Sequence, residues 1–157
     1  RCRRHPLARA VRADKLTLAA LEATLRLYED ERVAVREVPT LSMLTADPAD
    51  LAARARALAE RLREALGGGA RVEVVPGVSR SGAGALPGVD LPTTLVAVAP
   101  AGLSPDRAAA ALRRWDPPVL VRIQDDRLLV DPRTLLPGEE DVLAAALAAI
   151  MRPPGGE

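Results

Sequence analysis

The chain has 157 residues, of which 48% are hydrophobic, and its 22 basic and 21 acidic residues leave a formal charge of +1. This length and composition allow one folded domain, or part of a larger protein, and exclude a wholly disordered chain. One cysteine excludes an internal disulfide framework. Because no apolar run reaches the roughly 18 residues of a membrane span, we expect no membrane partner.

The first 30 residues predict two helices. Pro6 suits the first turn of a helix, and strong helix formers follow it. Asp14 predicts a break, because its side chain can cap a second helix that begins at Lys15. This second helix has a wide apolar stripe, so we expect it to be mostly buried. The stripe consists of Leu18, Leu21, Leu25 and Tyr28.

Helix and strand patterns alternate along the rest of the chain. Asp47 and Pro48 predict the capped start of a helix that ends at Leu66. Further helices are expected at residues 105–114 and 139–151. Strands are expected at residues 71–75, 93–99, 119–123 and 127–130, the last two forming a hairpin.

This order of elements predicts an α+β fold, with a small mixed or antiparallel sheet and helices mainly on one face. We divide the chain into a helical segment over residues 1–30, a small α/β domain over 31–152 and a disordered tail over 153–157.

Phosphate-loop and metal motifs are not predicted. In the Gly-rich stretch of residues 79–88, Pro87 stands where a dinucleotide fingerprint needs its third glycine. A P-loop needs Gly-Lys, whereas the only lysine is Lys15. One histidine, His5, and one cysteine, Cys2, do not supply a metal site, so we expect no metal. With two aromatic residues in the chain, the stacking platforms of single-strand RNA modules are also unsupported.

Four basic residues are candidates for binding or catalysis. Arg9 and Arg12 would share a helix face, with Lys15 continuing the row, and two converging guanidinium groups can hold a phosphate-like anion. A charged face in water is the alternative that spacing alone leaves open. Lys15 could form a Schiff base, although its place after a helix cap also fits a solvated cation. Arg122 interrupts the apolar run 119–123, and is therefore either exposed at a sheet edge or directed toward a ligand.

The segment from His5 to Tyr28, which begins His-Pro-Leu-Ala-Arg-Ala-Val-Arg, resembles the signature segment of bacterial selenocysteine synthases, the L-seryl-tRNA(Sec) selenium transferases. The likeness covers nearly the whole chain. It continues through Pro39-Thr40-Leu41, Leu86-Pro87-Gly88, Pro118-Val119, Arg122-Ile123 and Asp131-Pro132-Arg133-Thr134.

This resemblance implies the C-terminal small domain of a fold-type I, aspartate-aminotransferase-like enzyme that depends on pyridoxal 5'-phosphate (PLP). Residues 1–30 would link it to the large domain that binds the cofactor. Members convert seryl-tRNA(Sec) to selenocysteinyl-tRNA(Sec) with selenophosphate, through a PLP-bound aminoacrylyl intermediate. They are cytoplasmic homo-oligomers, typically decamers.

The resemblance also implies roles for individual residues. Arg9 and Arg12 would hold the phosphate group of selenophosphate. The family's Schiff-base lysine lies upstream in a Gly-Asp-Lys motif that is absent here, so Lys15 is not that lysine. The chain would then contribute no catalytic residue and be inactive alone.

The sequence departs from the family pattern at two places. The loop around Ser79–Ala85 has less glycine than is usual, and Asp125-Asp126 stands where Asp-Gly is usual. Two other functions stay open on the sequence. One is a non-catalytic paralogue that serves as an oligomerisation or RNA-binding module, and the other is a PLP-dependent lyase acting on a free amino acid.

Overall fold

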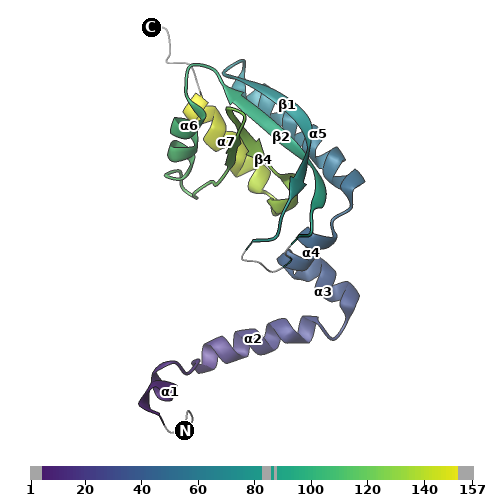
Figure 1. Ribbon diagram of the computed structural model, residues 1–157, viewed down its shortest axis with the longest axis vertical. Helices are drawn as coiled ribbons and strands as arrows, with labels where there is room; N and C mark the ends of the chain where they lie inside the picture. The colour runs from purple at the N-terminus through teal and green to yellow at the C-terminus, as the bar shows by residue number, and fades with distance from the viewer. Residues whose placement is uncertain (1–4, 83–85, 87, 152–157) are drawn as a thin grey trace. The chain divides into compact units, whose positions relative to one another are not determined.

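The computed structural model describes residues 5–82, 86 and 88–151 (Figure 1). Cys2, Pro87 and the predicted tail at 153–157 lie outside the described residues. The chain forms two compact units, Arg1–Thr45 and Ala46–Glu157. The division into a linking segment over 1–30 and a domain over 31–152 stays a prediction.

The described part of the first unit is helical. It contains α1 (Pro6–Ala10), α2 (Lys15–Leu27), α3 (Glu31–Glu37) and α4 (Pro39–Thr45). Asp14 caps α2 as predicted, because its carboxylate accepts hydrogen bonds from the backbone N–H groups of Leu16 at 2.8 Å and Thr17 at 2.9 Å. The hydrogen bonds from the backbone and hydroxyl of Thr17, with that from Leu16, lower the pKa of Asp14.

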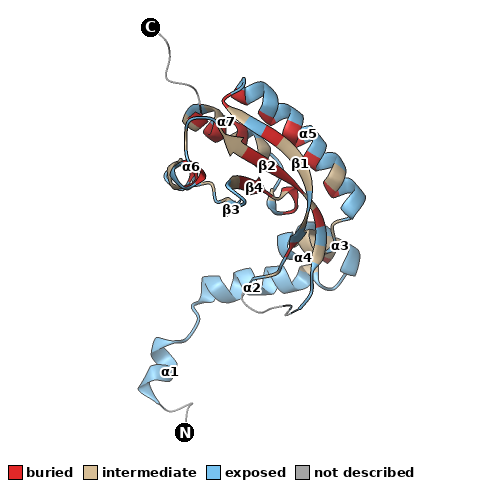
Figure 2. Ribbon diagram, turned by 45° about the horizontal axis from the view of Figure 1, so that its top comes forward, coloured by how far each residue is buried: buried red, intermediate tan, exposed pale blue. Residues whose placement is uncertain are grey.

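The prediction that α2 is mostly buried is wrong for this chain. No residue of α2 is buried, and Leu18, Leu21 and Leu25 are each more than half exposed (Figure 2). The spacing correctly groups these leucines on one side of the helix. Burial, however, requires a second element over that side, and their exposure shows that no described element of the first unit covers it.

The second unit contains a four-stranded antiparallel sheet, as one of the two sheet types expected. Its strands are β1 (Ala70–Ser79), β2 (Leu91–Pro100), β3 (Arg122–Gln124) and β4 (Arg127–Val130), in the order β1-β2-β4-β3. Its helices are α5 (Pro48–Leu66), α6 (Pro105–Leu112), the 3-10 helix η2 (Pro132–Thr134) and α7 (Glu139–Met151). The hairpin between β3 and β4 turns through Asp125 and Asp126, which both have positive φ, as a two-residue turn of type I′ requires.

The strand expected at 119–123 is shorter than predicted and begins only at Arg122. The backbone N–H of Val119 donates to the carbonyl of Leu112 at the end of α6, at 3.0 Å. Pro117 and Pro118 before it have no N–H to offer a ladder. Residues 119–121 therefore lie outside the strand, and pairing with the sheet starts at Arg122.

The main core lies between one face of the sheet and helices α5, α6 and α7. Alternate residues Val96 and Val98 of β2 join side chains of all three helices in one buried cluster. Leu95 and Ala97 point to the other face and form a small buried cluster with Leu129. Among the described residues, this second cluster includes no helix side chain, so the charged side chains of that face are candidates for ligand contacts.

Gly69 gives a sharp test of how α5, the sheet and α7 fit together. A Cβ atom at Gly69 would lie 2.4 Å from the backbone oxygen of Met151 at the end of α7. Gly69→Ala is therefore expected to lower the free energy of unfolding by about 2 kcal/mol, since backbone must move to admit the methyl group. Gly82→Ala, whose Cβ meets nothing within 4 Å, is the control and should change it little. Urea unfolding followed by Trp115 fluorescence measures both, and equal stability of the two variants would contradict this packing.

Candidate functional site

The Arg9–Arg12 pair lies where α1 ends. His5 caps α1 through its Nδ1, which accepts the Leu7 N–H at 3.2 Å, and α1 ends at Ala10. Arg9 is in the last turn of α1, and the backbone N–H of Arg12 donates to the Arg9 carbonyl at 3.4 Å. One turn of chain therefore separates the two arginines, as the spacing predicted.

The predicted helical row from Arg9 through Arg12 to Lys15 is wrong. Arg12 lies in the connection after α1, and Asp14 has the extended backbone of a helix cap, with φ −76° and ψ 172°. Because a cap residue must leave helical geometry, the chain changes direction before Lys15. Arg9 and Arg12 stay paired by the turn, whereas Lys15 begins a separate helix.

The charges of this turn are available to a ligand. Arg9, Arg12 and Lys15 are all exposed, and none forms an ion pair with a carboxylate in the part of the chain that the structure describes. Two unpaired guanidinium groups one turn apart can offer several N–H donors to a phosphate-type anion.

The surroundings of Lys15 in this structure differ from those of a typical Schiff-base lysine. A lysine that forms Schiff bases at neutral pH is activated by burial or by a cationic neighbour that disfavours its charge. Lys15 is exposed at the first position of α2 and follows the Asp14 carboxylate. That Lys15 is not the attachment point of this cofactor stays a prediction.

A buried polar network joins the ends of β1, β2 and β4 in the second unit. The Asp131 carboxylate accepts hydrogen bonds from the hydroxyls of Ser79 at 2.5 Å and Thr93 at 3.0 Å, and from the Arg133 backbone N–H at 3.1 Å. The guanidinium of Arg133, which is 6% exposed, donates to the Ser79 hydroxyl at 3.1 Å and to the Pro92 carbonyl at 2.7 Å. This network fixes where the three strands end.

The local sequence pattern indicates only part of this network. Asp131 before Pro132 repeats the cap-then-proline pattern that opens α5 and α6, and it does cap η2. Nothing in the local pattern indicates Ser79 and Thr93 as partners, because they lie 52 and 38 positions away. Their alignment comes from the antiparallel pairing of the strands.

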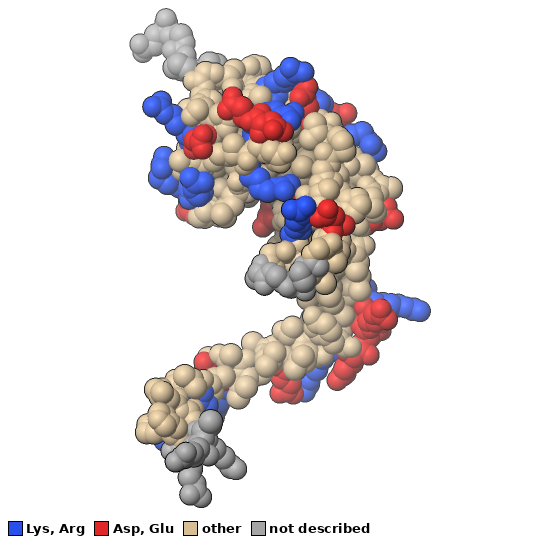
Figure 3. Space-filling view, viewed as in Figure 1, with Lys and Arg blue, Asp and Glu red and all other residues tan. Residues whose placement is uncertain are grey.

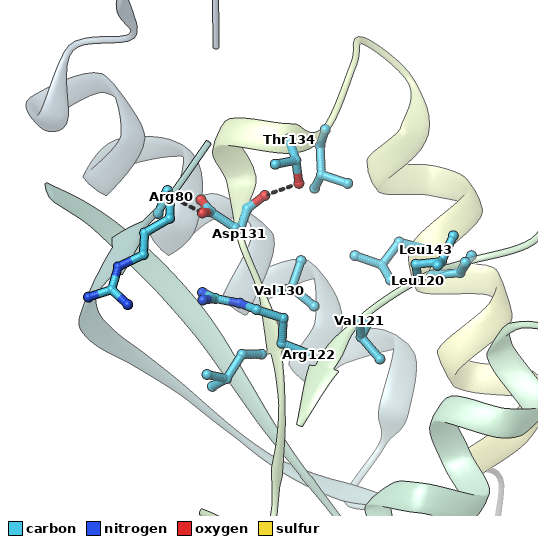
Figure 4. Close-up of a pocket in the computed structure, with 12 residues that line it drawn as sticks. Arg80, Leu120, Val121, Arg122, Val130, Asp131, Thr134 and Leu143 are labelled. Atoms are coloured by element: carbon cyan, nitrogen blue, oxygen red, sulfur yellow. Dashed lines mark hydrogen bonds between the residues drawn. The ribbon is translucent and has the colours of Figure 1, made fainter. Parts of the chain in front are cut away.

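Arg122 lies beside this network. It is exposed on the edge strand β3, and it also lines a cavity of about 410 Å³ together with Arg80 and Asp131 (Figure 4). The sheet-edge position that the sequence allowed for Arg122 is thus observed, while its role toward a ligand stays a prediction. Arg80 is held by Asp90, whose Oδ1 accepts from its Nε at 2.8 Å, and this hydrogen bond raises the pKa of Arg80.

Elsewhere on the second unit, charges of both signs are interspersed. Figure 3 shows basic and acidic side chains mixed over the visible face of this unit, without one continuous basic surface. Many of these charges form pairs, such as Arg54 with Glu140 at 3.0 Å. In the described ranges, no group of three or more His, Cys, Asp or Glu side chains is placed to hold a metal ion. None of the described helices has the length and apolar character needed to cross a membrane.

The fold and these sites define an α+β protein that exposes an arginine pair at an N-terminal turn. Residues 1–136 match the protein family described as SelA: L-seryl-tRNA selenium transferase, and the chain belongs to this family. The resemblance seen in the sequence is thereby confirmed.

Relatives of known activity match nearly all of the chain. It is 55% identical over 152 residues to the L-seryl-tRNA(Sec) selenium transferase of Nitratidesulfovibrio vulgaris, a match that covers 97% of this chain and 32% of that protein. The same enzyme of Solidesulfovibrio magneticus is 53% identical, with 96% and 33% covered, and that of Moorella thermoacetica is 52% identical, with 91% and 30% covered. The chain thus spans about a third of the length of these relatives.

Proposed function

We propose that the chain is the C-terminal portion of an L-seryl-tRNA(Sec) selenium transferase, which converts seryl-tRNA(Sec) to selenocysteinyl-tRNA(Sec) with selenophosphate. The observation that carries this proposal is the 55% identity to such an enzyme over 97% of the chain. A free amino acid as substrate, or a role without catalysis, is the competing outcome of the test below.

In this proposal Arg9 and Arg12 bind the phosphate group of selenophosphate. Their exposure, their lack of a carboxylate partner among the described residues and their separation by one turn support this role. Two guanidinium groups offset the charge of the anion and fix its orientation, so that the selenium atom is presented in one direction. They position the donor and exchange no proton with it, because a guanidinium keeps its protons at any physiological pH.

PLP is the cofactor of this proposed enzyme, and most of its site lies in another part of the protein. Since Lys15 does not fit the attachment of PLP, the lysine that holds it belongs to a segment outside this chain. The chain alone is therefore expected to be inactive.

The proposed architecture is that of a fold-type I enzyme, with residues 31–152 as its small domain and residues 1–30 as the link to the large domain. The apolar face of α2, exposed at Leu18, Leu21 and Leu25, supports such a link, because a face of this kind is stable in water only when another surface covers it. Assembly as a homo-oligomer, a decamer in this proposal, would cover further surface.

The function is tested with the full-length protein, purified tRNA(Sec) charged with serine, and selenophosphate. The expected product is selenocysteinyl-tRNA(Sec), identified after release of the amino acid. Free serine and free cysteine in place of the charged tRNA are the matched controls and should give no product. Turnover of a free amino acid alone would show a lyase, and no turnover with any substrate would favour a non-catalytic paralogue.

A further inference from the structure

The cavity beside β3 lies within the second unit and contains two arginines that the proposed selenophosphate site does not use. We propose that this cavity is a second anion-binding site, in which Arg80 and Arg122 bind the phosphate of a nucleotide whose body packs on the apolar wall. The proposal stands independently of the proposed function, because it concerns binding and not turnover.

Arg122 supplies a cation without a carboxylate partner. Its Nη1 lies 3.5 Å from the carbonyl oxygen of Val78, a long hydrogen bond, and it forms no ion pair with any described carboxylate. Figure 4 shows its side chain running across β4 toward Asp131 and Arg80. An arginine that is extended over a cavity and weakly bound retains most of its donors for a ligand.

Arg80 supplies the second cation from the end of β1. Asp90 engages its Nε, and its two terminal nitrogens make no hydrogen bond with the described residues. The ion pair fixes the side chain while leaving these donors available. Two guanidinium groups at one cavity are the usual means of binding a phosphate with several hydrogen bonds.

Asp131 also lines the cavity, and its negative charge must be accounted for. Its carboxylate already accepts hydrogen bonds from Ser79, Thr93 and the backbone of Arg133. The buried guanidinium of Arg133, bound to the Ser79 hydroxyl, offsets that charge at close range. Asp131 therefore does not neutralise the positive charges of Arg80 and Arg122. In this proposal these two arginines bind the anion at their end of the cavity.

The opposite end of the cavity is apolar and decides the class of ligand. Leu120 and Leu143 lie close together in Figure 4, away from the arginines, and Val121 lies between them and Arg122. Leu120 is 80% exposed, so its side chain is available to pack against the apolar part of a ligand. A cavity of about 410 Å³ is also larger than a bare phosphate needs and lies in the range of small-molecule sites. A phosphate joined to a flat, partly apolar base satisfies both ends.

Two sources of such a nucleotide are possible, a free nucleotide and the terminal nucleotide of an RNA strand. The test uses the full-length protein with Arg9→Ala and Arg12→Ala, so that the first anion site is removed. Isothermal titration calorimetry then measures binding of AMP and of a short single-stranded RNA that ends in adenosine. Adding Arg122→Ala is expected to weaken binding by about tenfold to a hundredfold. Arg122→Lys, which keeps the charge but loses the fork, should restore part of the loss.

Arg56→Ala is the matched control, because Arg56 is exposed on α5 and does not line the cavity. It should leave AMP binding unchanged. Binding of AMP but not of the RNA would support the site with a free nucleotide as ligand, and tighter binding of the RNA would support it with the strand end as ligand. The proposal is overturned if neither probe binds, or if Arg122→Ala and Arg56→Ala have the same effect.

Discussion

Replacing both Arg9 and Arg12 by alanine in the full-length protein is expected to lower kcat/KM for selenophosphate by about 100-fold or more, since each lost charge-assisted hydrogen bond contributes about 1.5–3 kcal/mol. Both side chains are exposed and have no carboxylate partner in the described ranges. Their removal should therefore leave the fold intact. The loss should appear first in the KM for selenophosphate, while the KM for seryl-tRNA(Sec) and the absorbance of the bound cofactor stay unchanged.

Arg32→Ala is the control for this prediction. Arg32 is exposed in the same unit, and its side chain forms no ion pair with the described residues. It should retain full activity, and Arg9→Lys with Arg12→Lys should retain an intermediate one, because lysine keeps the charge without the two-pronged geometry. Normal selenophosphate-dependent turnover in the double alanine variant would rule out the arginine pair as the anion site.

Arg133→Met is expected to have the largest effect on stability, a loss of about 3 kcal/mol in the free energy of unfolding. Methionine keeps much of the volume but removes the guanidinium. The Pro92 carbonyl then loses its donor, which lies at 2.7 Å, and the Asp131 carboxylate loses the positive charge that compensates it. Urea unfolding followed by Trp115 fluorescence measures the loss.

Two further variants compare the stability contribution of this buried network with that of an ordinary surface ion pair. Arg127 forms a pair with Glu73 at 3.4 Å, but its side chain is 29% exposed, so Arg127→Met should cost less than about 1 kcal/mol. Ser79→Ala removes one link between Asp131 and Arg133 and should cost about 1–2 kcal/mol. If Arg133→Met were no more destabilising than Arg127→Met, the network would not hold the strand ends together.

Local signals in the sequence predicted most of the secondary structure. Asp14, Asp47 and Ser104 each accept hydrogen bonds from the first turn of the helix that follows, as their positions indicated. The bounds of α5 and α7 match the expected ones. Capping, proline placement and periodicity depend on residues within about four positions of one another, and a sequence displays such relations directly.

Local sequence patterns did not predict contacts between residues that are far apart in the chain. The Asp131–Ser79 hydrogen bond spans 52 positions, and one cavity is lined by both Arg80, which follows the end of β1, and Arg122, which begins β3, although β1 and β3 are the two outer strands of the sheet. The exposure of α2 was also not predictable from local sequence. An apolar stripe indicates that a helix packs against another surface, but it does not identify that surface.

The sequence by itself therefore determined the family, the helix starts and the candidate arginines Arg9, Arg12 and Arg122. Tertiary structure alone decided that Asp131 and Arg133 are tied to Ser79, and that Arg122 shares a cavity with Arg80. The physical reason is that helix caps and turns are set by neighbouring residues, whereas burial, charge compensation and cavities depend on which distant surfaces the folded chain brings into contact.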